Sequence, residues 1–296
     1  MLYTQLRAFH GVAAHGGFTA AAKVMNVGQP TLTSHVKSLQ SDFDVELFHP
    51  RGRGVVLTDA GVTLFQLTRR IMDLEGEARD LLNAFGGYNV GELHVGAVGP
   101  YHATEMLSLF SEMFPDIKLS VAVGNSRKMV DLLLDYSVDV AVLAHVEDDP
   151  RIYAMPYSRH PVRLFVPKSH PFAKRRKVSI SELEGQRMVF REKGSTTRLA
   201  FERALQDAQV SVVTVMEIGS REAVWMAVAR GIGISVVSDI EFIPHPQIQM
   251  VEISDVEIYT TAHVNCLKER QDSHLVKAFF DVVLQIKATQ DIALQA

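Results

Sequence analysis

The sequence predicts an α/β protein with an all-α, winged N-terminal unit, a long helix after it, and a two-lobed α/β domain. Three observations predict this order. Residues 3–43 repeat apolar side chains at helical spacing around a turn and a proline. Residues 59–85 carry an apolar stripe at intervals of four and three. From residue 91 onward, strand-like and helix-like segments alternate, which is typical of parallel sheets covered by helices on both faces.

The segment before residue 30 is expected to hold two helices and a turn. Residues 3–15 repeat apolar side chains on one helical face, namely Leu6, Phe9, Val12 and Ala13. Thr19 can cap a short second helix of good helix formers, because its hydroxyl can accept a hydrogen bond from a free backbone N–H. Asn26 and Gly28 then supply a turn, since both residue types tolerate positive φ.

A third helix is expected to start at Pro30, because proline lacks the N–H that the first turn of a helix leaves unpaired. Leu32, Val36 and Leu39 make its inward stripe. The outward face is polar and can reach base edges and phosphates in a DNA major groove. An ordinary amphipathic surface helix has the same pattern. The candidate DNA contacts of this region are Thr19, Gln29, Pro30, Thr31, Thr33, Ser34, His35 and Lys37.

Residues 45–58 place two short apolar, strand-like pieces around a turn of Gly and Arg, which is the pattern of a β-hairpin wing. Arg51 and Arg53 at its tip suit contact with phosphates or the minor groove. A solvated charged turn would carry the same residues. Because three helices and a wing follow one another in this order, we predict a winged helix-turn-helix DNA-binding domain over residues 1–58.

Residues 59–87 are expected to form a long linker helix, which Thr58 can cap. Its apolar stripe consists of Ala60, Leu64, Leu67, Ile71, Leu74, Ala78, Leu81 and Phe85. A lone helix would expose this stripe, so we predict a coiled-coil dimerisation helix. The alternative is that the stripe packs against its own domain. Gly86-Gly87 ends the helix and marks a domain boundary.

Several runs in the first 85 residues carry a family resemblance: Leu6-Arg7-Ala8-Phe9, Gly17-Phe18-Thr19-Ala20-Ala21-Ala22, Gln29-Pro30-Thr31-Leu32-Thr33, Glu46-Leu47-Phe48 and Leu57-Thr58-Asp59-Ala60-Gly61. In these runs the chain resembles LysR-type transcriptional regulators. Gly28 stands where that family commonly has Ser, and His49 where Arg is common. The resemblance implies DNA recognition by the winged domain and a periplasmic-binding-protein-like effector domain in the rest of the chain.

Bulk properties set limits on the class of protein. The chain has 296 residues and a formal net charge of −4, so nucleic-acid binding depends on a local patch. Cys266 is the single cysteine, which excludes an internal disulfide and a thiolate zinc cluster. No signal-peptide pattern and no 18-residue apolar run is present, so we expect a cytoplasmic protein without membrane contact.

Residues 91–296 are expected to form the effector-binding domain, with lobe one at about 91–161 plus 267–296 and lobe two at about 162–266. Ligands of open α/β sheets bind outside the carboxyl ends of the strands, where helix N-termini converge. Four strand-to-helix turns qualify, and their candidate effector-binding residues are Gly99, Pro100, Tyr101, His102, Asn125, Ser126, Ser195, Thr196, Thr197, Arg198, Ser220, Arg221 and Glu222.

The turn that precedes the helix from Thr196 is the most informative of the four. Free N–H groups at a helix start, together with three hydroxyls and Arg198, form a cage suited to phosphate, phosphonate, sulfate or carboxylate. Ser195 or Thr196 could instead act only as the N-cap of the helix. Four polar turns that meet in one cleft nevertheless favour a pocket for an anion.

Two further runs resemble regulators associated with aminoethylphosphonate catabolism: Gly124-Asn125-Ser126, and residues 135–145 with Asp148-Asp149-Pro150. This resemblance implies a zwitterionic effector with an anion cage at one end and a carboxylate at the other. Glu192, Glu222 or the acidic loop at 145–150 could supply the carboxylate. Neither a metal nor a cofactor is expected.

The sequence offers no catalytic constellation. Gly231-Ile232-Gly233 follows a predicted helix instead of preceding one, and phosphate-loop, zinc-protease and nucleophile-elbow motifs are missing. We therefore expect no enzyme but a sequence-specific transcriptional regulator. Its expected partners are double-stranded DNA, a small anionic or zwitterionic effector, further copies of the chain in a homodimer or homotetramer, and, as a candidate, RNA polymerase. The alternative is a stand-alone cytoplasmic small-solute-binding protein without DNA recognition.

Overall fold

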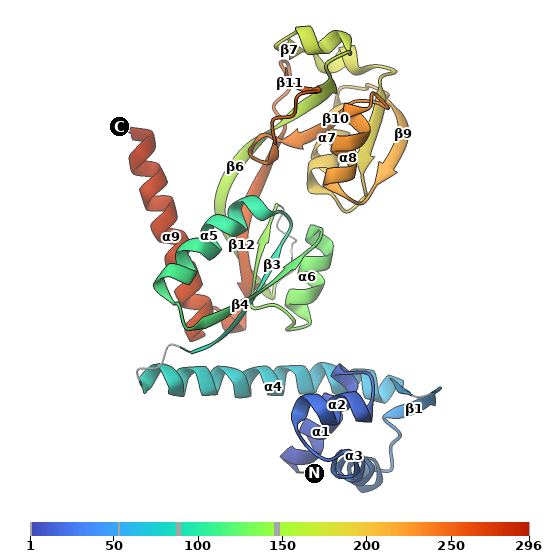
Figure 1. The fold of residues 1–296 in the computed structure, drawn as a ribbon, viewed down its shortest axis with the longest axis vertical. Coiled ribbons are helices and arrows are strands. Elements are labelled where there is room, and N and C mark those ends of the chain that lie inside the picture. The colour runs from blue at the N-terminus through green and yellow to red at the C-terminus, as the bar shows by residue number, and fades with distance from the viewer. Residues whose placement is uncertain (1, 53, 87–89, 145–148, 296) are drawn as a thin grey trace. The chain divides into compact units, whose positions relative to one another are not determined.

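The structure of the chain, a computed structural model, describes residues 2–52, 54–86, 90–144 and 149–295. The chain divides into two compact units, Met1–Tyr88 and Asn89–Ala296, which are drawn in Figure 1. Within the described residues, no helix is both long and apolar enough to cross a bilayer.

The first unit is a small helical domain with a hairpin. Its elements are α1 (Tyr3–Ala14), α2 (Phe18–Met25), α3 (Gln29–Phe43), β1 (Phe48–Arg51), β2 (Gly54–Leu57) and α4 (Asp59–Phe85). The apolar faces of α1 and α3 meet in one core, which includes the buried side chains of Leu6, Phe9, Val12, Leu32, Val36 and Leu39. The inward stripes expected from the sequence are therefore confirmed for both helices.

The start of α2 corrects one expectation. Thr19 is not the N-cap: α2 already begins at Phe18, and Gly17 is the N-cap residue. The ring of Phe18 packs on Phe48, with ring centroids 6.0 Å apart, so the residue before Thr19 is already part of the packed helix. Thr19 stays exposed in the first turn. At the other end, Asn26 adopts a left-handed conformation with φ of 54° and ends α2, as the turn chemistry predicts.

The wing is an antiparallel pair in which Phe48 lies opposite Leu57 and Arg51 opposite Gly54. Gly52 at its tip has φ of +57°, a backbone conformation that glycine adopts without steric cost. The predicted contact residue Arg53 lies outside the described residues. The expected hairpin is thus confirmed.

Helix α4 starts where the sequence predicts. The Thr58 hydroxyl accepts a hydrogen bond from Gly61 N at 3.0 Å and donates one to the Glu46 carbonyl at 2.7 Å. Leu64 and Phe65 pack against the core of the first unit. Farther along, the apolar stripe is exposed in the single chain, with exposed fractions of 62% at Leu74 and 81% at Phe85.

The second unit is built on a mixed sheet with the strand order β4-β3-β5-β12-β6-β11-β7, and β10 also pairs with β6. Its strands are β3 (Gly91–Ala97), β4 (Ile117–Val123), β5 (Val140–Leu143), β6 (Ile152–Pro167), β7 (Lys177–Val178), β8 (Arg187–Arg191), β9 (Val213–Ile218), β10 (Ser235–Ser238), β11 (Ile248–Ile253) and β12 (Tyr259–Leu267). Its α-helices are α5 (Pro100–Met113), α6 (Ser126–Leu134), α7 (Thr196–Asp207), α8 (Arg221–Ala229) and α9 (His274–Gln295). The 3₁₀ turns are η1 (Pro171–Lys174), η2 (Ile180–Leu183), η3 (Asp239–Glu241) and η4 (Lys268–Arg270).

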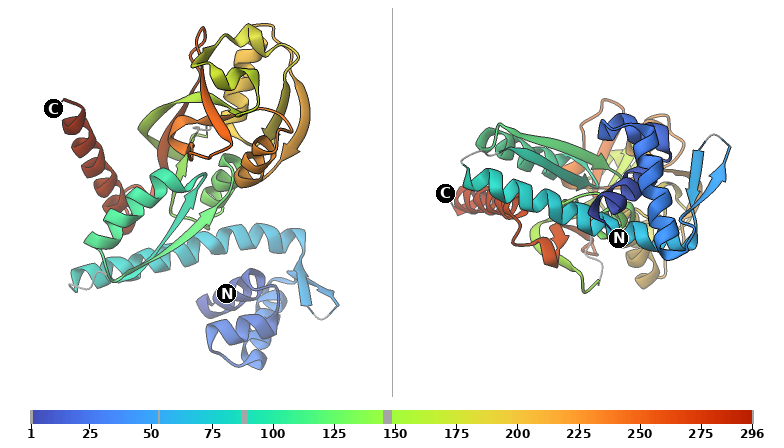
Figure 2. Two further views of the ribbon diagram at one scale, coloured as in Figure 1. Left: turned by 45° about the horizontal axis from the view of Figure 1, so that its top comes forward. Right: turned by 90° about the horizontal axis from the view of Figure 1, so that it is seen from below.

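Lobe one forms around β3, β4 and β5, which run parallel. Because strand side chains alternate between faces, Val140 and Val142 point into the core under α5 and α9, whereas Ala141 and Leu143 point toward α6. Figure 2 shows α5 and α9 side by side on their face of the sheet. The C-terminal helix therefore returns to lobe one, as the sequence predicts.

Lobe two corrects a second expectation. Two of its strands, β8 and β9, are parallel to each other, but β10 runs antiparallel to β6. The contact of this segment with β8 is an isolated parallel bridge between Met188 and Ile234. The reason is the length of β6: its C-terminal half extends into lobe two and pairs antiparallel with β10, so the strands of this lobe are not all parallel. The sequence pattern does not reveal this strand, since its apolar run at residues 162–166 gives no sign that it begins at Ile152.

The two lobes are joined by β6 and β12. These strands pair antiparallel from Ile152 opposite Leu267 to Pro161 opposite Tyr259. The register shifts between Ala262 and His263, which marks a β-bulge in the ladder. Figure 1 shows the two strands running side by side from lobe one into lobe two.

Candidate functional site

The polar face of α3 is the first candidate site. The helix begins at Gln29, one residue before the expected start, and Pro30 is its second residue, where a missing N–H still costs no helical hydrogen bond. Because Leu32, Val36 and Leu39 take up the inward face, the polar side chains are left partly or fully exposed: Gln29, Thr31, Thr33, Ser34, His35 and Lys37. This face can meet a surface that offers both hydrogen-bonding groups and negative charge.

The hydroxyl group of Thr33 already makes a hydrogen bond within α3. Its Oγ1 donates to the Gln29 carbonyl at 2.9 Å. The hydroxyl proton is therefore engaged within the helix, and the side chain offers its lone pairs and its methyl group to a partner. Arg51 at the end of β1 is exposed, which leaves its guanidinium available to phosphates.

The second candidate site is a cleft between the two lobes of the second unit. Three adjoining hollows form it, each of about 300 to 400 Å³ and open to solvent. The hollow nearest the predicted anion cage is lined by polar groups from both lobes: Asn125, Ser126, Arg191, Ser195, Thr196, Thr197, Arg221, Ser238, Glu241 and Thr260. A neighbouring hollow is lined by Gly99, Tyr101, His102 and His160.

Three of the four predicted turns come together around these hollows, and the fourth contributes Arg221. Asn125 caps α6 by accepting from Lys128 N at 3.0 Å, and Ser195 caps α7 by accepting from Arg198 N at 3.4 Å. Ser126 is buried, and its Oγ has no hydrogen-bond partner among the described residues. An unpaired buried hydroxyl that lines a cleft is suited to a bound solute, because burial without a partner costs free energy.

Arg198 corrects the composition of the predicted cage. Its guanidinium donates to Glu202 and Glu217, both at 2.7 Å, and to the Arg191 carbonyl at 2.5 Å. The residue is 7% exposed and lies over the Phe190 ring, with 5.1 Å to the ring centroid. Arg198 thus ties α7 to β8 and β9 and does not line the cleft. The sequence places it one helical position after the hydroxyls but gives no sign of these acidic partners.

Ser220 and Glu222 also stand outside the cleft lining. The Ser220 hydroxyl donates to Glu222 at 2.7 Å and accepts from Ala223 N at 3.3 Å, so it caps α8. Both residues are exposed. Pro100 is the first residue of α5, and the acidic segment at 145–148 lies outside the described residues.

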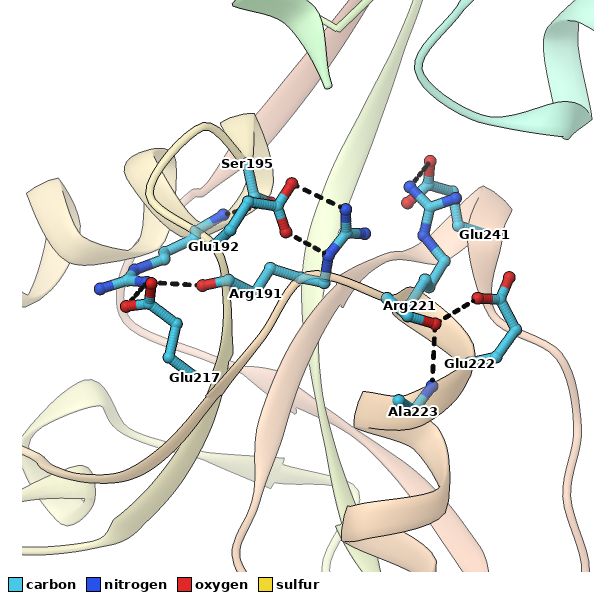
Figure 3. Close-up of polar contacts among 10 residues, drawn as sticks. Arg191, Glu192, Ser195, Glu217, Arg221, Glu222, Ala223 and Glu241 are labelled. Carbon is cyan, nitrogen blue, oxygen red and sulfur yellow. Dashed lines mark hydrogen bonds and ion pairs between the residues drawn. The ribbon is translucent and has the colours of Figure 1, made fainter. Parts of the chain in front are cut away.

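The charged groups that line the cleft include two that the sequence reasoning missed. Arg191 ends β8 and binds Glu192 through two hydrogen bonds of 2.8 and 2.9 Å. Glu241 ends η3 and accepts from Arg221 Nη2 at 2.9 Å. Figure 3 shows both arginine–glutamate pairs and their place beside the Ser195 turn. Arg191 could have been found as the last residue of a predicted strand, whereas Glu241 lies in η3, a short turn that the sequence pattern does not mark.

The pKa shifts in the cleft follow from burial and these pairs. Burial raises the pKa of Glu241 above its ordinary value, although Arg221 and Arg191 oppose the shift. For Glu192 burial also raises the pKa, but the hydrogen bonds from Arg191 and Asn125 outweigh it and the net pKa is lowered. Burial and the neighbouring His160 lower the pKa of His102 to about 4. His102 is therefore neutral at pH 7.

Glycine at two positions allows the lobes to lie close together at the cleft. A Cβ added to Gly99 would lie 2.9 Å from Glu241 Oε1, and one added to Gly194 would lie 2.7 Å from Asn125 Nδ2. In both cases a glycine of one lobe faces a polar side chain of the other. The cleft is thus narrow where its charged groups stand.

Comparison with known protein families identifies the family of the chain that carries these sites. Residues 3–62 match the model described as the bacterial regulatory helix-turn-helix protein, lysR family, and residues 86–287 match the LysR substrate binding domain. The chain belongs to the LysR family. Its members are transcriptional regulators, so at the level of the family this LysR protein is a DNA-binding regulator with a substrate-binding domain, not an enzyme.

Curated relatives of this LysR protein span most of the chain. It is 31% identical over 236 residues to the RuBisCO operon transcriptional regulator of Allochromatium vinosum, covering 79% of this chain and 78% of the relative. It is 30% identical over 290 residues to a probable RuBisCO transcriptional regulator of Thalassiosira pseudonana, covering 93% of each.

Solved structures share the fold. A full-length OxyR from Pseudomonas aeruginosa matches with a TM-score of 0.77 at 22% identity, covering 96% of this chain and 94% of that one. CbnR, a LysR family regulator crystallised in full length with its target DNA, matches with a TM-score of 0.70 at 23% identity, covering 96% and 99%. The mixed sheet of the second unit is therefore the fold of the LysR substrate-binding domain.

Proposed function

We propose that this LysR regulator recognises its operator with the polar face of α3 and with the wing, and that a small anionic or zwitterionic metabolite bound in the cleft modulates DNA binding or activation. The observation that carries the proposal is the cleft itself. Hydroxyls and helix N-termini from both lobes, together with two arginines of lobe two, line one opening, in a chain whose first unit presents an exposed polar α3.

The DNA contacts are proposed residue by residue. Thr31, Thr33, Ser34 and His35 lie on the exposed face of α3 and would meet base edges, whereas Lys37 and Arg51 would meet phosphates. The likeness in fold to CbnR, which was crystallised with its target DNA, supports this mode of binding. In a dimer, two such helices would lie about 34 Å apart along the duplex, which matches a pseudo-palindromic site.

Fluorescence anisotropy with the DNA upstream of the protein's own gene, at stated salt, tests the DNA-binding role. Thr33→Ala should reduce discrimination between operator and random DNA by roughly 1 kcal/mol or more, because Thr33 would contact a base. Arg51→Ala should weaken binding to all sequences and reduce the salt slope by about 1, because it would contact phosphate. Arg203→Ala, an exposed arginine on α7, is the matched control.

A solute-binding protein without DNA recognition is the rival function. The match of residues 3–62 to the helix-turn-helix model disfavours it. A folded protein that binds solutes but shows no preference for the upstream DNA would support the solute-binding function instead.

The effector is proposed to be a small anion or zwitterion, with phosphonates as one candidate class. Arg191 and Arg221 supply charge, and Ser126, Ser195 and Thr196 supply hydroxyls around one hollow. Charge-assisted hydrogen bonds of this kind recognise phosphate, phosphonate, sulfate and carboxylate groups.

Calorimetry with a panel of small phosphonates, sulfonates and carboxylates tests the effector site. Arg191→Gln should weaken binding of the preferred anion by about 1.5–3 kcal/mol, because one charge-assisted hydrogen bond is lost. Arg203→Gln removes a guanidinium outside the cleft and should change nothing. Equal affinities of the wild type and Arg191→Gln would contradict the assignment.

A further inference from the structure

Among the residues that the structure describes, Glu241 is the one carboxylate that lines these three hollows. It borders all three hollows, and its side chain is 17% exposed. From lobe one, Gly99 approaches it so closely that an added Cβ would lie 2.9 Å from its Oε1. A nearly buried carboxylate therefore stands where the two lobes and all parts of the cleft meet.

The cations of the cleft are already paired. Arg191 is held by Glu192 through two hydrogen bonds, and Arg221 is held by Glu241 at 2.9 Å. A ligand with only negative charge would have to compete with these carboxylates. Its negative charge would also lie close to the carboxylate of Glu241. The repulsion between the two is strong because little water is present in a buried site to screen it.

We infer that the effector is a short zwitterion whose cationic nitrogen binds Glu241 while its anionic end is held by the arginines and hydroxyls. The inference rests on the proposed function of the cleft and names its ligand class. An ammonium group donates to Glu241 in place of Arg221, and Arg221 is then free to join Arg191 on the anion.

The surroundings of Glu241 suit an ammonium group. The Thr260 hydroxyl donates to Ser238 Oγ at 3.0 Å, so the Thr260 oxygen keeps lone pairs that can accept from a ligand nitrogen. His102, which lines the same hollow, is neutral at pH 7 because burial lowers its pKa to about 4. Neutral imidazole adds no repulsion toward a cation.

The opposite end suits an anion. Ser126 Oγ is buried in the lining of the adjoining hollow without a hydrogen-bond partner in the described part of the chain. The first N–H groups of α7 start at Thr196, beside Ser195 and Arg191. Helix N-termini favour negative charge. The two ends of the cleft thus differ in the charge that they accept.

Calorimetry on the full-length protein with matched ligand pairs tests the inference. The pairs are 2-aminoethylphosphonate with ethylphosphonate and 3-aminopropanoate with propanoate, which separate the amine from the anion and phosphonate from carboxylate. In the wild type, the amine-bearing member of at least one pair should bind about 10- to 100-fold more tightly, because one hydrogen bond between charged groups is added.

Glu241→Gln should abolish this ratio, and it should bind the amine-free anion at least as tightly as the wild type does, because Arg221 is released. Misfolding would weaken the binding of both ligands. Unchanged or tighter binding of the amine-free anion therefore distinguishes a ligand-binding role of Glu241 from a structural one. Glu222→Gln, an exposed carboxylate on α8 outside the cleft lining, should keep the wild-type ratio.

The outcomes separate the two proposals. Equal binding of both members of each pair by the wild type would overturn the zwitterion proposal and leave an anion-binding cleft. A folded Glu241→Gln variant that keeps the wild-type ratio would do the same. Failure of every member to bind the folded protein would count against the effector cleft itself.

Discussion

Gly61 and Gly76 both lie in α4, but their surroundings differ. A Cβ added to Gly61 would lie 2.2 Å from the Leu47 carbonyl oxygen, whereas one added to Gly76 would meet nothing within 4 Å. Gly61→Ala should therefore destabilise the first unit by about 1–3 kcal/mol or more, since backbone must move. Gly76→Ala should stabilise α4 by about 0.5–1 kcal/mol through helix propensity.

Amide hydrogen exchange of α1 and α4 in the full chain measures both changes. The two variants carry the same substitution in the same helix, so each is the control for the other. Equal protection in both variants would show that the close approach of Gly61 to Leu47 does not constrain the domain.

Arg198 gives a second prediction for a single residue. Its two glutamates remain 40% and 46% exposed, so its loss leaves them solvated and removes mainly the hydrogen bond to Arg191 and the packing on Phe190. Arg198→Met should lower the free energy of unfolding by about 1–3 kcal/mol. Ligand affinity should stay nearly unchanged, because the side chain does not line the cleft.

Urea unfolding followed by the fluorescence of Trp225, the single tryptophan, measures the stability change, and calorimetry measures affinity. Arg203→Met is the control on the same helix. A variant that keeps full stability but loses ligand binding would return Arg198 to the predicted cage.

At the level of single residues, the sequence predicts those roles that depend on residues nearby in the chain. Thr58 caps α4, Asn26 ends α2, and Ser195 caps α7, because each depends on its immediate neighbours. Arg198 was misplaced and Glu241 missed because their roles depend on contacts made across the fold, with Glu217 on another strand and Arg221 on another helix. No spacing in the sequence records such contacts.

At the level of elements, β3 is joined to η4 through the charged side chain of Asp139. Asp139 accepts from the His94 backbone N–H at 2.6 Å, lies 3.4 Å from His94 Nδ1, and is paired with Arg270. The hydrogen bond with Asp139 raises the pKa of His94, against the opposing effect of burial. Protonated His94 therefore stabilises the folded state.

This stabilisation has a defined pH dependence. Because the folded pKa is raised above the unfolded value of about 6.5, the contribution is fully present below about pH 6.5 and is lost as pH rises through the folded pKa. Urea unfolding at about pH 6 and about pH 8.5 measures this contribution: relative to the wild type, His94→Gln should lose stability at about pH 6 and much less at about pH 8.5. An equal loss of stability at both pH values would exclude His94 as its source.

The elements of lobe one followed from the sequence better than those of lobe two. In lobe one, each strand pairs with a strand nearby in the chain, and short apolar runs such as Val140–Leu143 mark them. In lobe two, β10 pairs with the C-terminal half of β6, which lies far away in the sequence. Their pairing is set by partners that are distant in sequence, so local periodicity could not reveal it.

At the level of the whole molecule, the exposed stripe of α4 calls for a partner. Leu67, Leu74 and Phe85 are 52%, 62% and 81% exposed in the single chain, at the spacing of a coiled-coil seam. We expect a second copy of α4 to cover them. Leu74→Asp should shift the assembly to a smaller species, because a buried charge without a partner is strongly unfavourable.

Analytical ultracentrifugation across a concentration series measures this shift. Gln66→Asp introduces the same charge at an exposed position of α4 off the stripe and should leave the assembly unchanged. If both variants sediment as the wild type does, the helix does not carry the interface.

The dependence of lobe one on α9 has a consequence for how the protein is made. Phe279, Val282 and Val283 fill the same core as Leu93 and Val95, so this core is incomplete until residues 279–283 have left the ribosome. The helical domain of the first 88 residues has its own core and can fold while synthesis continues. During translation, the helix-turn-helix domain can thus fold well before the substrate-binding domain is complete.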